Sequence, residues 1–277
     1  MDCNNCNSKI ISEKMFCSNC GTKESTVERI TILITYQQIS KTGGRDNNED
    51  SAISVEANHN YCFVVADGLG GHGKGEVASQ LVVEVFEREF TENFAIDEGF
   101  LASTFQKAQN EVVELQQLQK ETGGMKTTAV VLTIARGECS WGHIGDSRLY
   151  IFDKNRVKLR TLDHSVPQML VAAGAIKEKH ISTHPDRNRI LRAIGGEGDS
   201  PKYELAQYNL SLEECQAFLL CTDGFWEHIT EKKMCKLLKR SKTVKEWLDA
   251  MVEEVEKNGT GRNMDNYTAI AIKTQQV

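Results

Sequence analysis

The sequence lacks any long hydrophobic run: nowhere does it reach the roughly eighteen consecutive apolar residues that a membrane-spanning helix needs. Its first thirty residues are polar and rich in Cys, so they lack the basic and apolar stretches of a secretory signal. Proline is scarce as well, with 3 among 277 residues. These absences predict a cytoplasmic protein without a membrane partner, and the length allows one large domain with a small appendage.

An excess of positive charge is also missing. The chain has 33 Lys and Arg against 39 Asp and Glu, a formal net charge of -6. Nonspecific nucleic-acid binding needs basic patches that neutralise phosphates, so we expect no nucleic-acid partner. The mild basic cluster at 232–245 is interpreted as a solvated helix face in preference to a binding patch.

Cysteine is concentrated at the N-terminus, where Cys3, Cys6, Cys17 and Cys20 form two Cys-x-x-Cys turns. Two such turns separated by a hairpin-length segment supply four thiolates at tetrahedral spacing, as a structural zinc site requires. A rubredoxin-type iron site, a redox dithiol and two disulfides are the alternatives; zinc is preferred because nothing else suggests electron transfer. We therefore predict a zinc-ribbon-like module at 1–24 with one structural Zn²⁺, followed by a linker at 25–30.

The remaining five Cys stand singly, mostly inside apolar runs, and are predicted to be small core residues. They are Cys62, Cys139, Cys215, Cys221 and Cys235.

The stretch at 65–79, VADGLGGHGKGEVAS, is the one around which the chain is organised. An apolar run at 61–65 leads into Asp67, a Gly-rich turn and a helix that starts near Lys74. This order places the Asp67 carboxylate at the end of a buried strand, where glycines let the backbone approach an ion or a phosphate. Taken alone, a Gly-rich turn before a helix also fits a phosphate cradle of the nucleotide-binding kind.

Apolar periodicity predicts the regular elements. Strands are expected at 30–36, 51–57, 61–65, 126–135, 138–144, 149–153, 156–161, 217–221 and 267–272, and helices at 74–94, 98–122, 167–173, 230–239 and 244–257. Because strands and helices are grouped instead of alternating strictly, the pattern predicts an α+β fold in which two antiparallel sheets pack together with helices outside. The segment 163–201 has little regular pattern, which is typical of a functional or mobile segment.

An acidic residue recurs at the mouths of the apolar strands, at Asp50, Asp67, Asp146, Asp223 and Asp265. A single Asp beside Gly is most often only a turn residue. Five carboxylates that converge repel one another, and protonation or bound cations relieve that repulsion. Hard divalent ions take oxygen ligands, so Mg²⁺ or Mn²⁺ is expected, whereas the shortage of His disfavours catalytic zinc.

Eight motifs occur in a fixed order: GRDNNEDS, VADGLGGHGKGEVAS, KTTAVV, GHIGDSRLYIF, LDHSVPQML with AGAI, ILRAIGG, LLCTDGFWEH and DNYTAI. In that order they resemble the bacterial metal-dependent protein serine/threonine phosphatases of type 2C, from about Thr31 to Lys273. The resemblance implies a four-layer α-β-β-α sandwich at 31–275 with a flap at about 163–201. The N-terminal Cys module lies outside that family's catalytic domain.

The resemblance also implies a reaction: hydrolysis of phosphoserine and phosphothreonine on proteins by a hydroxide that bridges two metal ions, without a phosphoenzyme intermediate. The sequence agrees in lacking the Cys-x5-Arg pattern of phosphocysteine enzymes. The resemblance implies that Asp67 bridges two Mn²⁺ or Mg²⁺ ions, with the Gly68 carbonyl and Glu49 (directly or through a water) on one and Asp223 and Asp265 on the other. It also implies that Asp50 holds a metal-bound water and that Asp146 with Asp223 holds a weaker third ion. Arg45 matches the phosphate-binding arginine, the alternative being a loop arginine paired with a nearby acid.

Two positions depart from the family pattern. Many eukaryotic members place a His directly after Asp-Gly as the proposed acid for the leaving alkoxide, and Leu69 stands there in this chain. His72 is the obvious substitute; a turn-stabilising role for His72, with a metal-bound water as the acid, is the alternative. Lys126 stands where the family usually has Gly, which is expected to alter the strand entry without touching the ligands.

Two functions stay open at this point. The first is an active phosphatase, and the second is a catalytically weak phosphoprotein-binding scaffold that the zinc module targets. All the acidic positions are present, which favours the enzyme. The expected partners are phosphorylated proteins and, by resemblance alone, a cognate Ser/Thr kinase and its substrates.

Overall fold

The computed structural model describes residues 32–70, 74–92, 99–118, 124–198, 200–261 and 263–276. The chain divides into two units, of which Ile32–Gln275 is the fold described below. The predicted Cys module at 1–24, with Cys3, Cys6, Cys17 and Cys20, lies outside the described residues, as do the linker at 25–30 and His72. Those predictions stay predictions.

A seven-stranded sheet forms the first inner layer. Its strands follow the order β10 (Leu210–Ser211), β6 (Glu138–Ile144), β5 (Ala129–Ala135), β3 (Asn60–Leu69) and β2 (Asp50–Ala57), with β4 (Lys126–Thr127) on β3 and β9 (Glu204–Leu205) on β6. These pairings are antiparallel. Two neighbouring pairs, β2 with β3 and β5 with β6, are hairpins.

A five-stranded sheet forms the second inner layer, in the order β1 (Ile32–Lys41), β12 (Tyr267–Gln276), β11 (Ala217–Cys221), β7 (Arg148–Asp153) and β8 (Arg156–Arg160). Strand β11 pairs antiparallel with both β12 and β7, and β7 pairs antiparallel with β8. Three hairpins in the two sheets turn through two residues with positive φ, which matches the twist of antiparallel strands. These residues are Asn58 and His59, Arg136 and Gly137, and Lys154 and Asn155.

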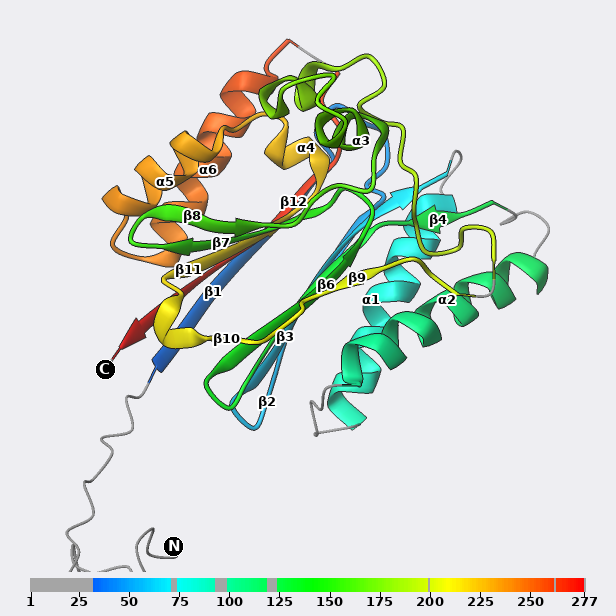
Figure 1. The fold of residues 1–277 in the computed structure, drawn as a ribbon, viewed down its shortest axis with the longest axis horizontal. Coiled ribbons are helices and arrows are strands. Elements are labelled where there is room, and N and C mark those ends of the chain that lie inside the picture. Colours follow the sequence, from blue (N-terminus) through cyan, green and yellow to red (C-terminus); the bar gives the residue numbers. More distant parts are fainter. Residues whose placement is uncertain are drawn as a thin grey trace, which may run out of the picture. The chain divides into compact units, whose positions relative to one another are not determined.

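Helices cover the outer face of each sheet (Figure 1). Helices α1 (Lys74–Glu92) and α2 (Phe100–Leu118) lie over the seven-stranded sheet, and α5 (Glu231–Arg240) and α6 (Val244–Gly259) lie over the five-stranded sheet. The predicted α+β arrangement of two antiparallel sheets with helices outside is confirmed. Among the described residues, no helix combines the length and apolar content that a membrane crossing requires.

Strand β3 explains why the central run is apolar at every position. Phe63 and Val65 belong to the core between the two sheets, whereas Cys62, Val64 and Ala66 belong to the core under α1 and α2. All five side chains are fully buried. A strand buried on both faces loses the alternation of polar and apolar residues, and each large side chain buried in it contributes about 1.5–3 kcal/mol.

Several element boundaries differ from the sequence predictions. The strand expected at 126–135 is divided into β4 and β5 at Thr128, and both parts pair with β3 in the same register. The strand expected at 30–36 continues as β1 to Lys41, and α4 (Asp223–Trp226) was not predicted. The segment 163–201 contains α3 (Val166–Ala172), near the predicted helix, and the 3₁₀ helix η2 (Glu178–Thr183).

Candidate active site

Five acidic side chains meet where strands of the two sheets end. Asp50 begins β2 and faces Asp67 near the end of β3. Asp223 lies two residues after the end of β11 and Asp265 lies two residues before the start of β12, and these two strands are antiparallel neighbours. Asp146 occupies the turn between β6 and β7, which connects the sheets. The structure thus brings the five predicted acids to one edge of the sandwich.

The backbone around Asp67 is held by two threonines. The Asp67 N–H donates to Thr128 Oγ1 (3.0 Å), and the Asp67 carbonyl accepts from Thr127 Oγ1 (2.8 Å) as well as from the Thr128 N–H. These contacts fix the backbone of Asp67 to the β4–β5 segment.

Gly68 lets helix α1 approach the site. A Cβ at Gly68 would lie 2.2 Å from the Gly75 carbonyl oxygen, a distance that no side chain tolerates. The Gly68 N–H also donates to the Glu49 carbonyl (3.0 Å). Glycine is therefore required at 68 by close backbone packing, which places its carbonyl and Glu49 beside Asp67.

The cluster holds several buried carboxyl groups close together, so their negative charges repel one another. Burial, with repulsion from neighbouring acids, raises the pKa of Asp67 and of Asp146 well above the usual range. Burial also raises the pKa of Asp50 to about 7 and that of Asp223 to about 6, and Asp223 hydrogen-bonds to Asp67. Burial and the neighbouring Asp265 raise the pKa of Glu49. The cluster is therefore costly to ionise without added positive charge.

The donor set fits divalent metal ions. Within the described part of the chain, Asp50 Oδ1 and Asp146 Oδ1 are buried and have no hydrogen-bond partner. Arg45 pairs with Asp265 of the cluster, with Nη2 2.8 Å from Oδ2. Carboxylate and carbonyl oxygens with an excess of negative charge are the ligands that Mg²⁺ and Mn²⁺ prefer.

Asn266 organises the loop that carries Glu49 and Arg45. Its Oδ1 accepts from the Glu49 N–H (2.8 Å), and its Nδ2 donates to the carbonyls of Thr42 (2.9 Å) and Asn47 (2.8 Å). Thr222 acts in the same way on Asp50, donating from Oγ1 to Oδ2 (2.9 Å). The roles of Asn266 and Thr222 were not predicted from the sequence. The sequence shows only that each of the two residues is adjacent to a predicted acid.

A cavity of about 290 Å³ lies beside Asp223 and Asp265. It is lined by residues of the predicted flap, of α4 and of the loops that hold the acids: Arg45, Ser182, Thr183, Arg187, Asn188, Asp223, Gly224, Glu227, His228, Asn263 and Asp265. Arg45 and Arg187 are the cations among them, and Arg187 Nε lies 3.2 Å from Glu227 Oε2. Arg187 was not predicted, because the irregular pattern of 163–201 gave no sign of which residue faces the site.

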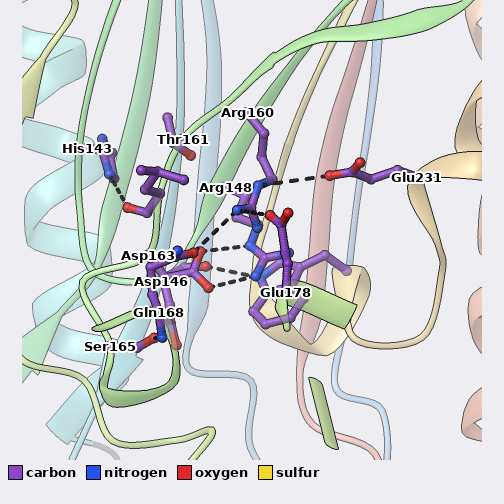
Figure 2. Close-up of polar contacts among 12 residues, drawn as sticks. His143, Asp146, Arg148, Arg160, Thr161, Asp163, Ser165, Gln168, Glu178 and Glu231 are labelled. Atoms are coloured by element: carbon purple, nitrogen blue, oxygen red, sulfur yellow. Dashed lines mark hydrogen bonds and ion pairs between the residues drawn. The ribbon is translucent and has the colours of Figure 1, made fainter. Parts of the chain in front are cut away.

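Arg148 and Trp226 hold the turn that carries Asp146. Arg148 makes a buried bidentate contact with Asp163 (2.7 and 2.6 Å), which Figure 2 shows beside Asp146. Its guanidinium carbon lies 3.4 Å from the centre of the Trp226 ring, and Trp226 Nε1 donates to the Asp146 carbonyl (3.0 Å). The network was not foreseen from the sequence, although Arg148 belongs to the GDSR motif.

Two stacked histidines support the same turn from the other side. The His143 and His164 rings lie 4.7 Å apart, centre to centre, and His143 Nε2 lies 2.8 Å from the Leu162 carbonyl. His164 Nδ1 accepts from the Gly145 N–H (3.2 Å), so its proton is on Nε2, 3.1 Å from Glu204 Oε1. Burial lowers the pKa of His164 to about 4 and also lowers that of His143. The three ligand-type side chains lie close together, but the Nε2 proton opposes a metal at His164.

The two positions that depart from the family pattern pair with each other. Leu69, at the end of β3, faces Lys126 of β4. Lys126 therefore sits in the short strand beside the Gly-rich turn.

Comparison with known proteins identifies the family of the chain. The family model described as "Protein phosphatase 2C" matches residues 40–267. The chain is 31% identical to the serine/threonine phosphatase stp of Listeria monocytogenes over 83% of this chain and 91% of that protein. It is 30% identical to the serine/threonine protein phosphatase PstP of Mycobacterium tuberculosis over 76% of this chain and 40% of that longer protein.

Solved structures give the same result. The crystal structure of the serine/threonine phosphatase Stp1 from Staphylococcus aureus has a TM-score of 0.80 and 26% identity, covering 88% of this chain and 96% of that chain. The catalytic domain of the phosphatase PstP, in complex with two manganese ions, has a TM-score of 0.73 and 26% identity, covering 88% of this chain and 99% of that chain.

Proposed function

The chain belongs to the protein phosphatase 2C family and is a metal-dependent protein serine/threonine phosphatase, and we propose that its five clustered aspartates form the catalytic centre. The observation that carries the proposal is their convergence from both sheets, with unpartnered oxygens on Asp50 and Asp146. Apolar side chains at this edge would stabilise the fold at a lower cost in free energy than buried carboxylates. Stability therefore does not explain the cluster.

Two Mn²⁺ or Mg²⁺ ions would be held by the set predicted from the sequence. Asp67 would contribute to both ions, the Gly68 carbonyl and Glu49 (directly or through a water) would bind one ion, and Asp223 and Asp265 would bind the other. Asp146 with Asp223 would hold a weaker third ion. When bound, these ions supply Lewis-acid chemistry, which lowers the pKa of water and stabilises charge on phosphoryl oxygens.

Asp50 is proposed to orient the attacking water. Its Oδ2 accepts from Thr222, whereas its Oδ1 is free to accept a water proton. The buried position of Asp50 keeps this carboxylate fixed beside Asp67.

Arg45 and Arg187, which both line the cavity of about 290 Å³, are proposed to bind the substrate phosphate. A guanidinium group donates two parallel hydrogen bonds to phosphate oxygens, and phosphate binding would replace the present carboxylate partners, Asp265 and Glu227. Arg45 pairs with Asp265 in the present structure, and it is also a candidate phosphate ligand. Since Arg187 belongs to the segment 163–201, that segment is proposed to act as the flap over the substrate.

The finer predictions are retained as proposals. His72 remains the candidate acid for the leaving alkoxide. A structural Zn²⁺ on Cys3, Cys6, Cys17 and Cys20, a cytoplasmic location and a cognate Ser/Thr kinase rest on the sequence arguments alone. The scaffold alternative has less support, because a binding module needs neither the unpartnered carboxylate oxygens nor their shared burial.

The test is Mn²⁺-dependent phosphate release from a phosphothreonine peptide and from p-nitrophenyl phosphate. We expect turnover by the wild-type chain and its loss in Asp223→Asn. Asp249→Asn is the matched control, because Asp249 is exposed and pairs with Lys245 on α6. No turnover by folded, Mn²⁺-loaded wild-type protein would favour the scaffold.

A further inference from the structure

A second cavity, of about 380 Å³, lies where β3, β4 and the segment 190–202 meet. We call it the Lys126 groove. It shares no lining residue with the 290 Å³ cavity beside Asp223 and Asp265, so it is separate from the proposed phosphate site. Its lining carries three cations, Lys126, Arg192 and Lys202, and one acid, Glu197.

Backbone pairing holds the groove close to Asp67. Leu69 faces Lys126 across the β3–β4 pairing, and Thr127 pairs in turn with Ile194 through two hydrogen bonds of 3.1 and 2.9 Å. Residues directly opposite each other in an antiparallel pair have side chains on the same face, which explains why Leu69 and Lys126 line the groove together. Leu69 lies two residues beyond Asp67 on β3, a step of about 7 Å along a strand.

The two lysines of the groove are free to bind a ligand. Neither Lys126 nor Lys202 forms an ion pair with another residue that the structure describes, and Lys202 is exposed. Arg192 differs, because its Nη1 lies 3.1 Å from Glu204 Oε1 and 3.5 Å from the Lys202 carbonyl. Arg192 therefore holds the segment 190–202 in place, whereas no described carboxylate neutralises the two ammonium groups.

The charge of the groove is opposite to that of the whole chain. Its lining carries three cations against one acid, whereas the chain has a formal net charge of -6. Repulsion from the whole chain disfavours acidic ligands in general, so a positive groove attracts them only locally. Leu191 adds apolar surface, because it lines the groove and is 53% exposed. The groove therefore suits an extended peptide that carries carboxylates.

We propose that the Lys126 groove binds acidic residues that flank the phosphothreonine of a protein substrate. The inference rests on the proposed phosphatase function and adds a substrate class to it, namely acidic phosphoprotein segments. When the phosphate is held at the aspartate cluster, an extended peptide that rises about 3.4 Å per residue reaches the groove within about two to four residues. Lys126 and Lys202 would then pair with the carboxylates of the peptide.

The test is steady-state hydrolysis of matched phosphothreonine peptides by the full chain with Mn²⁺. In one pair of peptides, Glu or Gln occupies the positions that precede the phosphothreonine; in the other pair, Glu or Gln occupies the positions that follow it. In one of the two pairs, the Glu peptide should have the higher kcat/KM by about tenfold, mainly through KM, as two partly exposed ion pairs allow.

Equal kcat/KM values for the Glu and Gln peptides in both pairs would overturn the inference and leave the proposed function standing, provided that p-nitrophenyl phosphate is hydrolysed. If the folded, Mn²⁺-loaded chain hydrolyses neither the peptides nor p-nitrophenyl phosphate, the proposed function fails and the inference fails with it. The small substrate therefore distinguishes the two failures.

Variants assign the preference to the two lysines. Lys126→Ala and Lys202→Ala should each lower the ratio of Glu-peptide to Gln-peptide kcat/KM by about threefold, and Lys126→Glu should bring it below one. Using the ratio cancels any change at the metal centre, and Lys202 is exposed, so its variant should fold. Lys239→Ala is the matched control, because Lys239 is exposed on α5 and should keep the wild-type ratio. An unchanged ratio in both groove variants would contradict the proposal.

Discussion

At the scale of single residues, the site is defined by charges that the fold holds together against their repulsion. Burial raises the pKa of Asp67, and the negative charges of four other aspartates raise that pKa further. Thr127 and Thr128 keep its backbone in place. The stability lost in this arrangement is recovered when cations bind, because a ligand that binds only the folded state stabilises it.

Asp67→Asn separates catalysis from stability. We expect phosphatase kcat with Mn²⁺ to fall by about 100-fold or more, as when a group that stabilises developing charge is removed. In EDTA, however, the variant should unfold at a higher temperature than the wild type, because one repelling charge is lost. Thermal unfolding in EDTA and a phosphopeptide assay in Mn²⁺ measure the two effects, and Asp249→Asn should change neither.

At the scale of elements, the same sequence pattern predicted both the fold and the convergence of the acids. Each acid adjoins an apolar strand, and antiparallel neighbours bring such strand ends together, so Asp50 with Asp67 and Asp223 with Asp265 followed from local patterns. The positions of β9, β10 and α4 were not predictable, because two to four residues carry no period. Asn266, Trp226 and Arg187 were missed since their roles come from contacts distant in sequence.

Gly68→Ala tests the close approach of β3 and α1. The new methyl group would meet the Gly75 carbonyl, so we expect a loss of about 3 kcal/mol in the free energy of unfolding, at the upper end for overpacking. Gly174→Ala is the control: its φ is 71° but nothing lies within 4 Å, so only the left-handed backbone cost of about 1 kcal/mol applies. Urea unfolding compares the two; equal losses would contradict the packing argument.

Arg187→Ala tests the flap. Loss of one phosphate-binding guanidinium should raise KM for a phosphothreonine peptide by about tenfold, the effect of a charge-assisted hydrogen bond worth about 1.5 kcal/mol, with a smaller change in kcat. Arg189→Ala is matched to it, because Arg189 is exposed, belongs to the same segment and pairs with Asp186 outside the cavity. Equal KM values for both variants would remove Arg187 from the substrate site.

At the scale of the whole domain, two sheets are joined by a turn that carries Asp146, and buried polar groups hold that turn. Arg148, Asp163 and Trp226 lie on one side of it, and His143 and His164 lie on the other. The stability of the domain should therefore depend on the protonation of the buried histidines. Glu204, Arg192 and Asp163 are the other charges that face this pair.

The folded state lowers the pKa of His164 to about 4, from about 6.5 in an unfolded chain. As the pH falls below 6.5, His164 binds a proton in the unfolded state before it does so in the folded state. The free energy of unfolding is therefore highest above pH 6.5 and decreases as the pH drops toward 4. The slope is at most about 1.4 kcal/mol per pH unit for this proton. Chemical denaturation between pH 4.5 and 7 should show a shallower slope in His164→Gln, whereas the exposed His180→Gln should keep the wild-type slope. An unchanged slope in His164→Gln would mean that the ring is already charged.

The central claim is that the aspartates from both sheets hold the catalytic metal ions. Anomalous diffraction from crystals of the wild-type chain grown with Mn²⁺ tests it most directly. We expect two strong peaks beside Asp67, with Asp223 and Asp265 at one of them, and a weaker peak at Asp146. Active, Mn²⁺-dependent protein whose crystals show no anomalous peak among these carboxylates would contradict it.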